Sequence, residues 1–207
     1  MAEKGCTASR HDVLNLMKFF KYKRRTLIKT EEPAQVEYRE EQFAKIAALQ
    51  EVFLENGCPV FSIDTKNKEL IGNFYSSGTY YGTEPQKVYD HDFPSFSEGK
   101  VIPHGIYDVG DNKGYLSLGT TKDTSEFVCH NFEHFWQQQL QWKYNGREWM
   151  LFLFDSGGSN NCRHYIFKED LFKLVQRIQM NIVVAHYPTY CSKYNPIEHR
   201  LFPHVTR

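Results

Sequence analysis

The sequence predicts an α/β fold in which a mixed sheet, three antiparallel strands followed by two parallel strands, is flanked by helices. Two observations predict it. Residues 102–109 and 114–118 are joined by Gly110-Asp111-Asn112-Lys113, a turn typical of a β-hairpin. Further along, short apolar runs alternate with stretches of helical spacing, which indicates parallel strands connected by helical crossovers.

Each element follows from its hydrophobic period or from a short apolar run. The expected helices are 11–25, 40–56, 125–141, 164–179 and a last one of at most thirteen residues starting at Asn195, and the expected strands are 59–64, 102–109, 114–118, 148–154 and 181–186. Run 148–154 is almost continuously apolar, as in a strand that is buried on both faces. Residues 73–100 are rich in Gly, Ser, Tyr and Pro and indicate a long excursion between strands.

Charge and length predict a two-part organisation. The chain has 207 residues and no formal net charge, yet residues 1–30 hold eight Lys and Arg against two acids. We therefore expect a basic helical segment with its linker at 1–37 and a larger domain at 38–207. The residues Lys21, Lys23, Arg24 and Arg25 are candidates for contact with DNA phosphates. An ordinary solvated basic helix face remains the alternative.

Cysteine usage and hydropathy indicate the compartment. The five cysteines are scattered and form no Cys-x-x-Cys pair, so we expect reduced thiols in a cytoplasmic protein. No apolar run approaches the roughly 18 residues of a membrane span, and no signal peptide is evident. We expect neither a membrane nor a small-molecule substrate as a partner.

Three acidic residues are the candidate catalytic site. Asp64 and Asp155 each end an apolar strand, and Glu198 lies in the first turn of the helix opened by Asn195 and Pro196. Ligands of mixed sheets lie at the carboxyl ends of the strands, where these side chains can converge. Paired divalent ions held there could activate water and cut a phosphodiester. With the strand order, the set indicates a ribonuclease-H-like metal nuclease.

Each of the three residues also has a purely structural interpretation. The two aspartates could simply open turns after strands. Asn195 is a good N-cap, and Glu198 could complete a capping box with it. Other candidate sites are weaker: a zinc pair at His130 and His134 beside Cys129, a cation site at Asp90 and Asp92, and a thiol nucleophile at Cys191 near His186 and His199.

Five segments in a fixed order resemble one family. They are SIDTKNKELIGNF (62–74), VYDHDFP (88–94), IPHGIYD (102–108), DSGGSN (155–160) and SKYNPIEHRLF (192–202). They resemble the Rhodopirellula-type DDE transposases of bacterial insertion sequences, from about residue 38 to the C-terminus and more loosely upstream.

The resemblance implies a ribonuclease-H-like core with Asp64, Asp155 and Glu198 as the catalytic, metal-binding carboxylates. It implies two Mg²⁺ ions, for which Mn²⁺ substitutes, and cleavage and transfer of DNA strands at transposon ends without a covalent protein intermediate. Double-stranded DNA is the expected partner, in a nucleoid-associated protein that forms homo-oligomers. Further DNA contacts are expected, by charge and proximity, at Lys66, Lys68, Lys193, His199 and Arg200. Ordinary surface charge is the alternative interpretation of the three lysines.

Two other functions stay open at this point. Family members extend well past the glutamate helix and begin with a helix-turn-helix region, so we expect this chain to be a fragment shortened at both ends. It could then be an inactive remnant that only binds DNA or a partner transposase. A host nuclease with the same fold is the third possibility.

Overall fold

The computed structural model describes residues 9–25, 38–76, 79, 81–120, 123–155, 164–189, 191 and 194–205. The chain divides into two compact units, residues 1–35 and 36–207. The first unit contains α1 (Arg10–Phe19), which is shorter than the expected helix 11–25. Its start is fixed by a capping box, in which the Ser9 hydroxyl accepts from the Asp12 N–H and the Asp12 carboxylate accepts from the Ser9 N–H.

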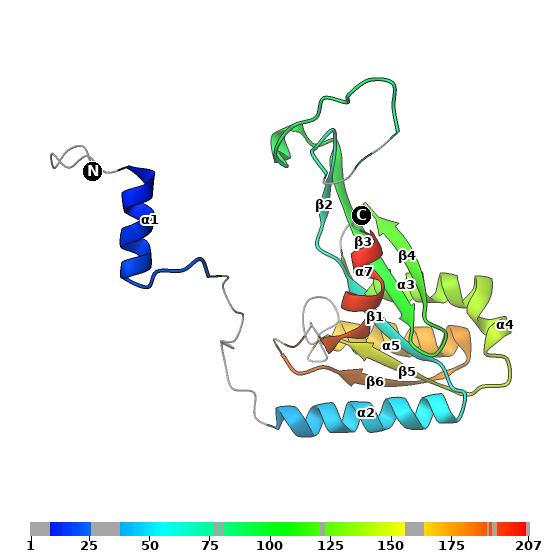
Figure 1. Cartoon of the computed structure of the whole chain (residues 1–207). Helices are drawn as coiled ribbons and strands as arrows, with labels where there is room; N and C mark the ends of the chain where they lie inside the picture. Colours follow the sequence, from blue (N-terminus) through cyan, green and yellow to red (C-terminus); the bar gives the residue numbers. More distant parts are fainter. Residues whose placement is uncertain are drawn as a thin grey trace. The chain divides into compact units, whose positions relative to one another are not determined.

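The second unit is built on one six-stranded mixed sheet (Figure 1). Its strands are β1 (Val60–Thr65), β2 (Glu69–Ile71), β3 (Gly99–Asp108), β4 (Lys113–Gly119), β5 (Trp149–Phe154) and β6 (Asn181–His186). The order is β2-β3-β1-β5-β6, with β4 also paired to β3. The pairs β1–β3 and β3–β4 are antiparallel, whereas β1–β5 and β5–β6 are parallel. The predicted fold class is confirmed, and β2, which pairs with the start of β3, is an addition to it.

Helices cover the sheet and follow the predicted order with changed boundaries. They are α2 (Arg39–Glu55), α3 (Ser125–Phe135), a π-helical turn η3 (Trp136–Leu140), α4 (Gln141–Lys143), α5 (Tyr165–Ile178), α6 (Pro196–Arg200) and α7 (Phe202–Val205). The last expected helix is therefore two short helices. The excursion after β2 contains a 3-10 turn η2 (Pro94–Phe96) and an isolated bridge between Phe74 and Tyr89.

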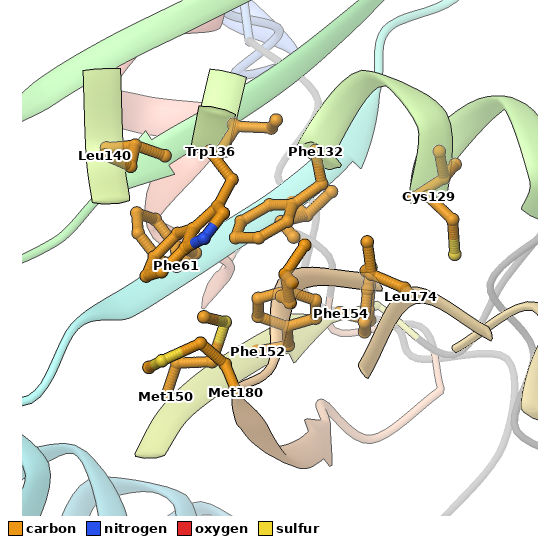
Figure 2. Close-up of a cluster of buried hydrophobic side chains, with 14 of the residues drawn as sticks. Phe61, Cys129, Phe132, Trp136, Leu140, Met150, Phe152, Phe154, Leu174 and Met180 are labelled. Atoms are coloured by element: carbon orange, nitrogen blue, oxygen red, sulfur yellow. The ribbon is translucent and has the colours of Figure 1, made fainter. Parts of the chain in front are cut away.

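Successive side chains of β1 point to opposite faces of the sheet, where two separate hydrophobic cores lie. Phe61 and Ile63 point to the face covered by α3 and α5, where an aromatic-rich cluster forms (Figure 2). Val60 points to the other face, where Leu151 and Leu153 of β5 meet Ile46 of α2. Ser62 and Asp64 share the parity of Val60, so the sheet directs them to the α2 face near its carboxyl edge.

Two further features of the described residues concern membrane-spanning helices and cysteine thiols. None of its helices has both the length and the apolar character that crossing a membrane requires. Cys58, Cys129 and Cys191 are free thiols. Cys6 and Cys162 lie outside the described residues.

Candidate functional site

The first two candidate carboxylates lie at the ends of neighbouring parallel strands. In the β1–β5 ladder Ser62 is opposite Leu153, and the same register continued by two residues pairs Asp64 with Asp155. Asp155 is half-buried and directly follows β5. Asp64 is only 7% exposed, and its Oδ1 accepts a hydrogen bond from the Thr65 N–H at 2.7 Å.

The third carboxylate is brought to β1 by contacts of the residues before it. The hydroxyl of Ser62 donates to Oδ1 of Asn195 and accepts from the N–H of Ile197 at 3.1 Å. Nδ2 of Asn195 donates to Oδ2 of Asp64 at 3.4 Å. These bonds fasten the start of α6 to β1, so half-buried Glu198, one residue after Ile197, lies on the same side of the sheet as Asp64.

The capping-box interpretation of Asn195 and Glu198 is wrong. No side-chain cap bond forms at Asn195, although this residue is the N-cap of α6. The Asn195 side chain is fully buried and turned to the strand instead. A side chain that could cap its own helix can instead form hydrogen bonds to another element when it is buried against that element.

The three carboxyl groups lie within electrostatic reach of one another. Burial, followed by the charge of Asp155 and then of Glu198, raises the pKa of Asp64 to about 8 against the effect of its two hydrogen bonds. Burial and Asp155 also raise the pKa of Glu198, while His199 and Lys66 act in the opposite direction. Like charges gathered in a partly buried site favour protonation. A divalent cation would relieve this repulsion.

The donor chemistry fits Mg²⁺ or Mn²⁺, although the groups are not arranged as a ligand cluster. Carboxylate oxygens are the ligands these hard cations take in proteins. Among the described residues, however, no three His, Cys, Asp or Glu side chains are grouped as closely as ligands of one ion. The site is therefore a set of mutually repelling carboxyls at one sheet edge.

A sequence model of the family described as Rhodopirellula transposase DDE domain matches residues 1–207. The chain belongs to this family. The family resemblance expected from the five segments is thus confirmed, and the family match extends through the basic N-terminal segment as well.

Solved structures of Mos1 transposase share the fold. The mariner Mos1 paired-end complex with Mg has a TM-score of 0.60 at 16% identity, covering 95% of this chain and 56% of that one. The Mos1 strand transfer complex gives 0.57 at 15%, covering 95% and 55%. The Mos1 paired-end complex with the left transposon end gives 0.55 at 14%, covering 96% and 56%. At these identities the likeness shows the ribonuclease-H-like fold alone, and this chain spans about half the length of the Mos1 chains. No curated protein matches.

The expected DNA-contacting residues differ in exposure and in their electrostatic relation to Glu198. Lys66 is 17% exposed, forms an ion pair with Glu69 and lies near enough to Glu198 to lower its pKa. Lys68, His199 and Arg200 are exposed. Lys193 lies outside the described residues. In the first unit, Lys21, Lys23, Arg24 and Arg25 are all exposed in the segment after α1.

The weaker candidate sites gain no support from the structure. Cys129 is buried, which raises its thiol pKa to about 12, and it forms no three-ligand group with described His, Asp or Glu residues. Cys191 is 1% exposed. Asp90 is 82% exposed, 3.8 Å from the imidazole of His91. None of these environments favours a thiolate or encloses a cation.

Two contributors to the site were missed in the sequence. Ser62 is a fully buried polar residue between buried Phe61 and Ile63, and such a residue needs a partner. A serine within the apolar run 59–63 is a signal that the sequence already contains. Gly105 lies opposite Asp64 in the β1–β3 ladder and leaves room for α6 and α7. Its role depends on which helix packs there, which the local sequence does not reveal.

Gly105→Ala is expected to weaken the docking of α6. A Cβ there would lie 2.8 Å from Ile197 Cδ1 and 2.8 Å from Phe202 Cε1, so both side chains must shift. Overpacking of this kind costs about 1–3 kcal/mol of unfolding free energy, measurable by urea denaturation. Gly99→Ala in the same strand is the matched control, because the nearest atom would be Ile71 Cδ1 at 3.9 Å. Equal stability of the two variants would contradict this packing.

Proposed function

We propose that this chain is the catalytic core of an insertion-sequence transposase that cuts DNA at the element's ends and joins those ends to target DNA with the help of divalent metal ions. The observation that carries the proposal is the placement of Asp64, Asp155 and Glu198 at one edge of the sheet, where Asp155 and Glu198 act on the buried carboxyl of Asp64. A buried carboxyl whose pKa is raised by neighbouring carboxyl groups, as at Asp64, is unfavourable unless a ligand uses it, and such sites are often functional.

The residues of the proposed site have two tasks, binding of the metal ions and attraction of DNA. The carboxylates of Asp64, Asp155 and Glu198 hold the ions. Paired ions bound there would supply the chemistry of the reaction, namely activation of the attacking water or 3′-hydroxyl and stabilisation of the leaving oxygen. Burial of Asp64 keeps water from competing at its oxygens. Lys66 and His199, whose charges are felt at Glu198, lie where they can attract a DNA phosphate.

Double-stranded DNA is the proposed partner, in the nucleoid of a bacterial cytoplasm. The Mos1 structures with a similar fold include a paired-end complex with a transposon end. The exposed Lys21, Lys23, Arg24 and Arg25 in this chain's first unit suit the phosphate backbone. Contacts of this kind carry little sequence information and weaken steeply with salt. Pairing of two ends would require more than one copy of the chain, so we propose a homo-oligomer on DNA.

A second candidate is a chain that binds DNA or a partner transposase without cutting. It is favoured by one observation: no group of three described His, Cys, Asp or Glu residues is close enough to hold an ion. Under this alternative the carboxyls would bind no Mn²⁺ when it is added.

One experiment tests the proposal against this alternative. The 207-residue chain is incubated with end-labelled duplexes carrying the element's terminal inverted repeat, or a scrambled repeat, at low salt with Mn²⁺ or EDTA. We expect Mn²⁺-dependent products with 3′-hydroxyl ends at the repeat, followed by joined products on target plasmid. Retention of the duplex in a gel without any product at millimolar Mn²⁺ would favour the second candidate.

A further inference from the structure

Asn195 connects two of the carboxylate-bearing elements through one side chain. Its Oδ1 accepts from the Ser62 hydroxyl of β1, and its Nδ2 donates to the carboxylate of Asp64 at 3.4 Å. The backbone of Asn195 is at the same time the N-cap of α6, the helix of Glu198. The side chain is 0% exposed.

The orientation of the carboxamide follows from its partners. With Oδ1 bonded to Ser62, the amide nitrogen is the atom that faces Asp64. The hydroxyl of Ser62 already accepts from the Ile197 N–H at 3.1 Å, which leaves its proton for Oδ1 of Asn195. Every polar atom in this chain of bonds therefore has a partner, a requirement for burying them at acceptable cost.

An amide suits this place better than a charged donor. A Lys or Arg bonded to Asp64 would add a positive charge where a cation is to bind. The carboxamide instead orients one oxygen of Asp64 without any net charge. The other oxygen, Oδ1, is held by the Thr65 N–H, another neutral donor. Groups behind a metal ligand that fix its orientation commonly change metal affinity ten- to a hundredfold.

We propose that Asn195 is a positioning residue, which aligns the Asp64 carboxylate and anchors the Glu198 helix so that both face the same metal ions. This inference rests on the proposed function, because it assumes that Asp64 and Glu198 are ligands. Asn195 is fully buried, so DNA is not expected to contact it. Its loss should therefore weaken metal binding and leave DNA affinity unchanged.

The test measures Mn²⁺ binding directly, without DNA, from the electron paramagnetic resonance signal of free Mn²⁺. Asn195→Ala is expected to raise the Kd for Mn²⁺ at least about tenfold. Asn131→Ala is the matched control: Asn131 is also buried, at 6% exposure, and bonds Ser117 away from the carboxylates. It should change the Kd less than about twofold. Equal Kd values for Asn195→Ala and the unaltered chain, or equal weakening by Asn131→Ala, would overturn the positioning role.

Two further variants keep the outcome interpretable. If Asn195→Ala does not fold, Ser62→Ala removes the hydroxyl that holds Asn195 and is expected to raise the Kd as well; an unchanged Kd would overturn the proposal. Asp64→Asn tests the underlying site. If Asp64→Asn also leaves Mn²⁺ binding intact, the proposed function fails; if only Asp64→Asn loses it, the positioning role alone fails.

Activity supplies a second readout that a merely structural role would not move. Cleavage by Asn195→Ala should be slow at low Mn²⁺ and recover toward the rate of the unaltered chain at saturating Mn²⁺, with unchanged retention of DNA. A loss of rate that is the same at every Mn²⁺ concentration would contradict a role through the metal ligands.

Discussion

Asp64→Asn is expected to lower Mn²⁺-dependent DNA cleavage by about a thousandfold or more. The substitution keeps the shape of the side chain and removes the charge that would bind a cation. Loss of one metal contact worth about 4 kcal/mol in the transition state corresponds to this factor. The measurement is the initial rate of 3′-hydroxyl formation on labelled transposon-end duplexes.

The other two carboxylates should behave in the same way. Asp155→Asn and Glu198→Gln are each expected to lower the rate of Mn²⁺-dependent cleavage by about the same factor as Asp64→Asn. The double variant Asp64→Asn with Glu198→Gln should cleave only slightly more slowly than either single variant, because the effects of substituting residues that act as a unit are not additive. Asp90→Asn is the control, since its carboxylate is 82% exposed in the excursion between β2 and β3.

Two results would count against this assignment. Cleavage that survives Glu198→Gln would remove Glu198 from the site, and an equal loss in Asp90→Asn would indicate a general effect of charge. Duplex retention should be similar in all four single variants, because binding to the phosphate backbone comes from Lys and Arg side chains rather than from the carboxylates.

The parts of the fold that were predicted correctly depend on local patterns. The hairpin of β3 and β4 follows from its turn, and β5 follows from six apolar residues in a row between polar segments. Once these strands are recognised, the preference for right-handed parallel crossovers restricts their arrangement. The placement of Asp64 and Asp155 at neighbouring strand ends then follows.

The parts that were missed depend on contacts between distant residues. β2 has three residues, and its pairing with the start of β3 defines it. The capping-box interpretation of Asn195 failed because Ser62 and Asp64, more than 130 positions away, bind its side chain. The division of the last helix did have a local signal in Pro203, which lacks an N–H and often interrupts a helical pattern.

In the metal-free chain, Asp64 is expected to contribute a loss of stability as pH rises from about 4 to about 8. The pKa of Asp64 is raised from 3.8 to about 8 by burial and by the charges of Asp155 and Glu198. The folded state therefore keeps a proton that the unfolded state releases above pH 4, and stability falls while the two states differ in bound protons. Since one pKa unit corresponds to about 1.4 kcal/mol, the loss is on the order of a few kcal/mol.

Comparison with Asp64→Asn isolates this contribution. Both ring nitrogens of buried His104 lack a hydrogen-bond partner within the described residues, and burial lowers its pKa from 6.5 to about 4. His104 therefore destabilises the fold as pH falls through that window, opposite in sign to Asp64. Because both proteins contain His104, its effect cancels in the difference. We expect Asp64→Asn to be the more stable protein at pH 8 in EDTA, with the two converging toward pH 4–5.

Addition of Mn²⁺ should reverse the order at pH 8. An ion that binds only the folded state stabilises it in proportion to the logarithm of its concentration over Kd, and Asp64→Asn lacks one ligand. Urea denaturation at pH 5 and 8, with EDTA or millimolar Mn²⁺, measures all eight free energies. Equal Mn²⁺ stabilisation of both proteins would place the ion elsewhere, and equal stability of both at pH 8 in EDTA would contradict the raised pKa. The expected pattern, a carboxylate that weakens the fold until a cation arrives, is the cost in stability of gathering three carboxyl groups at one sheet edge.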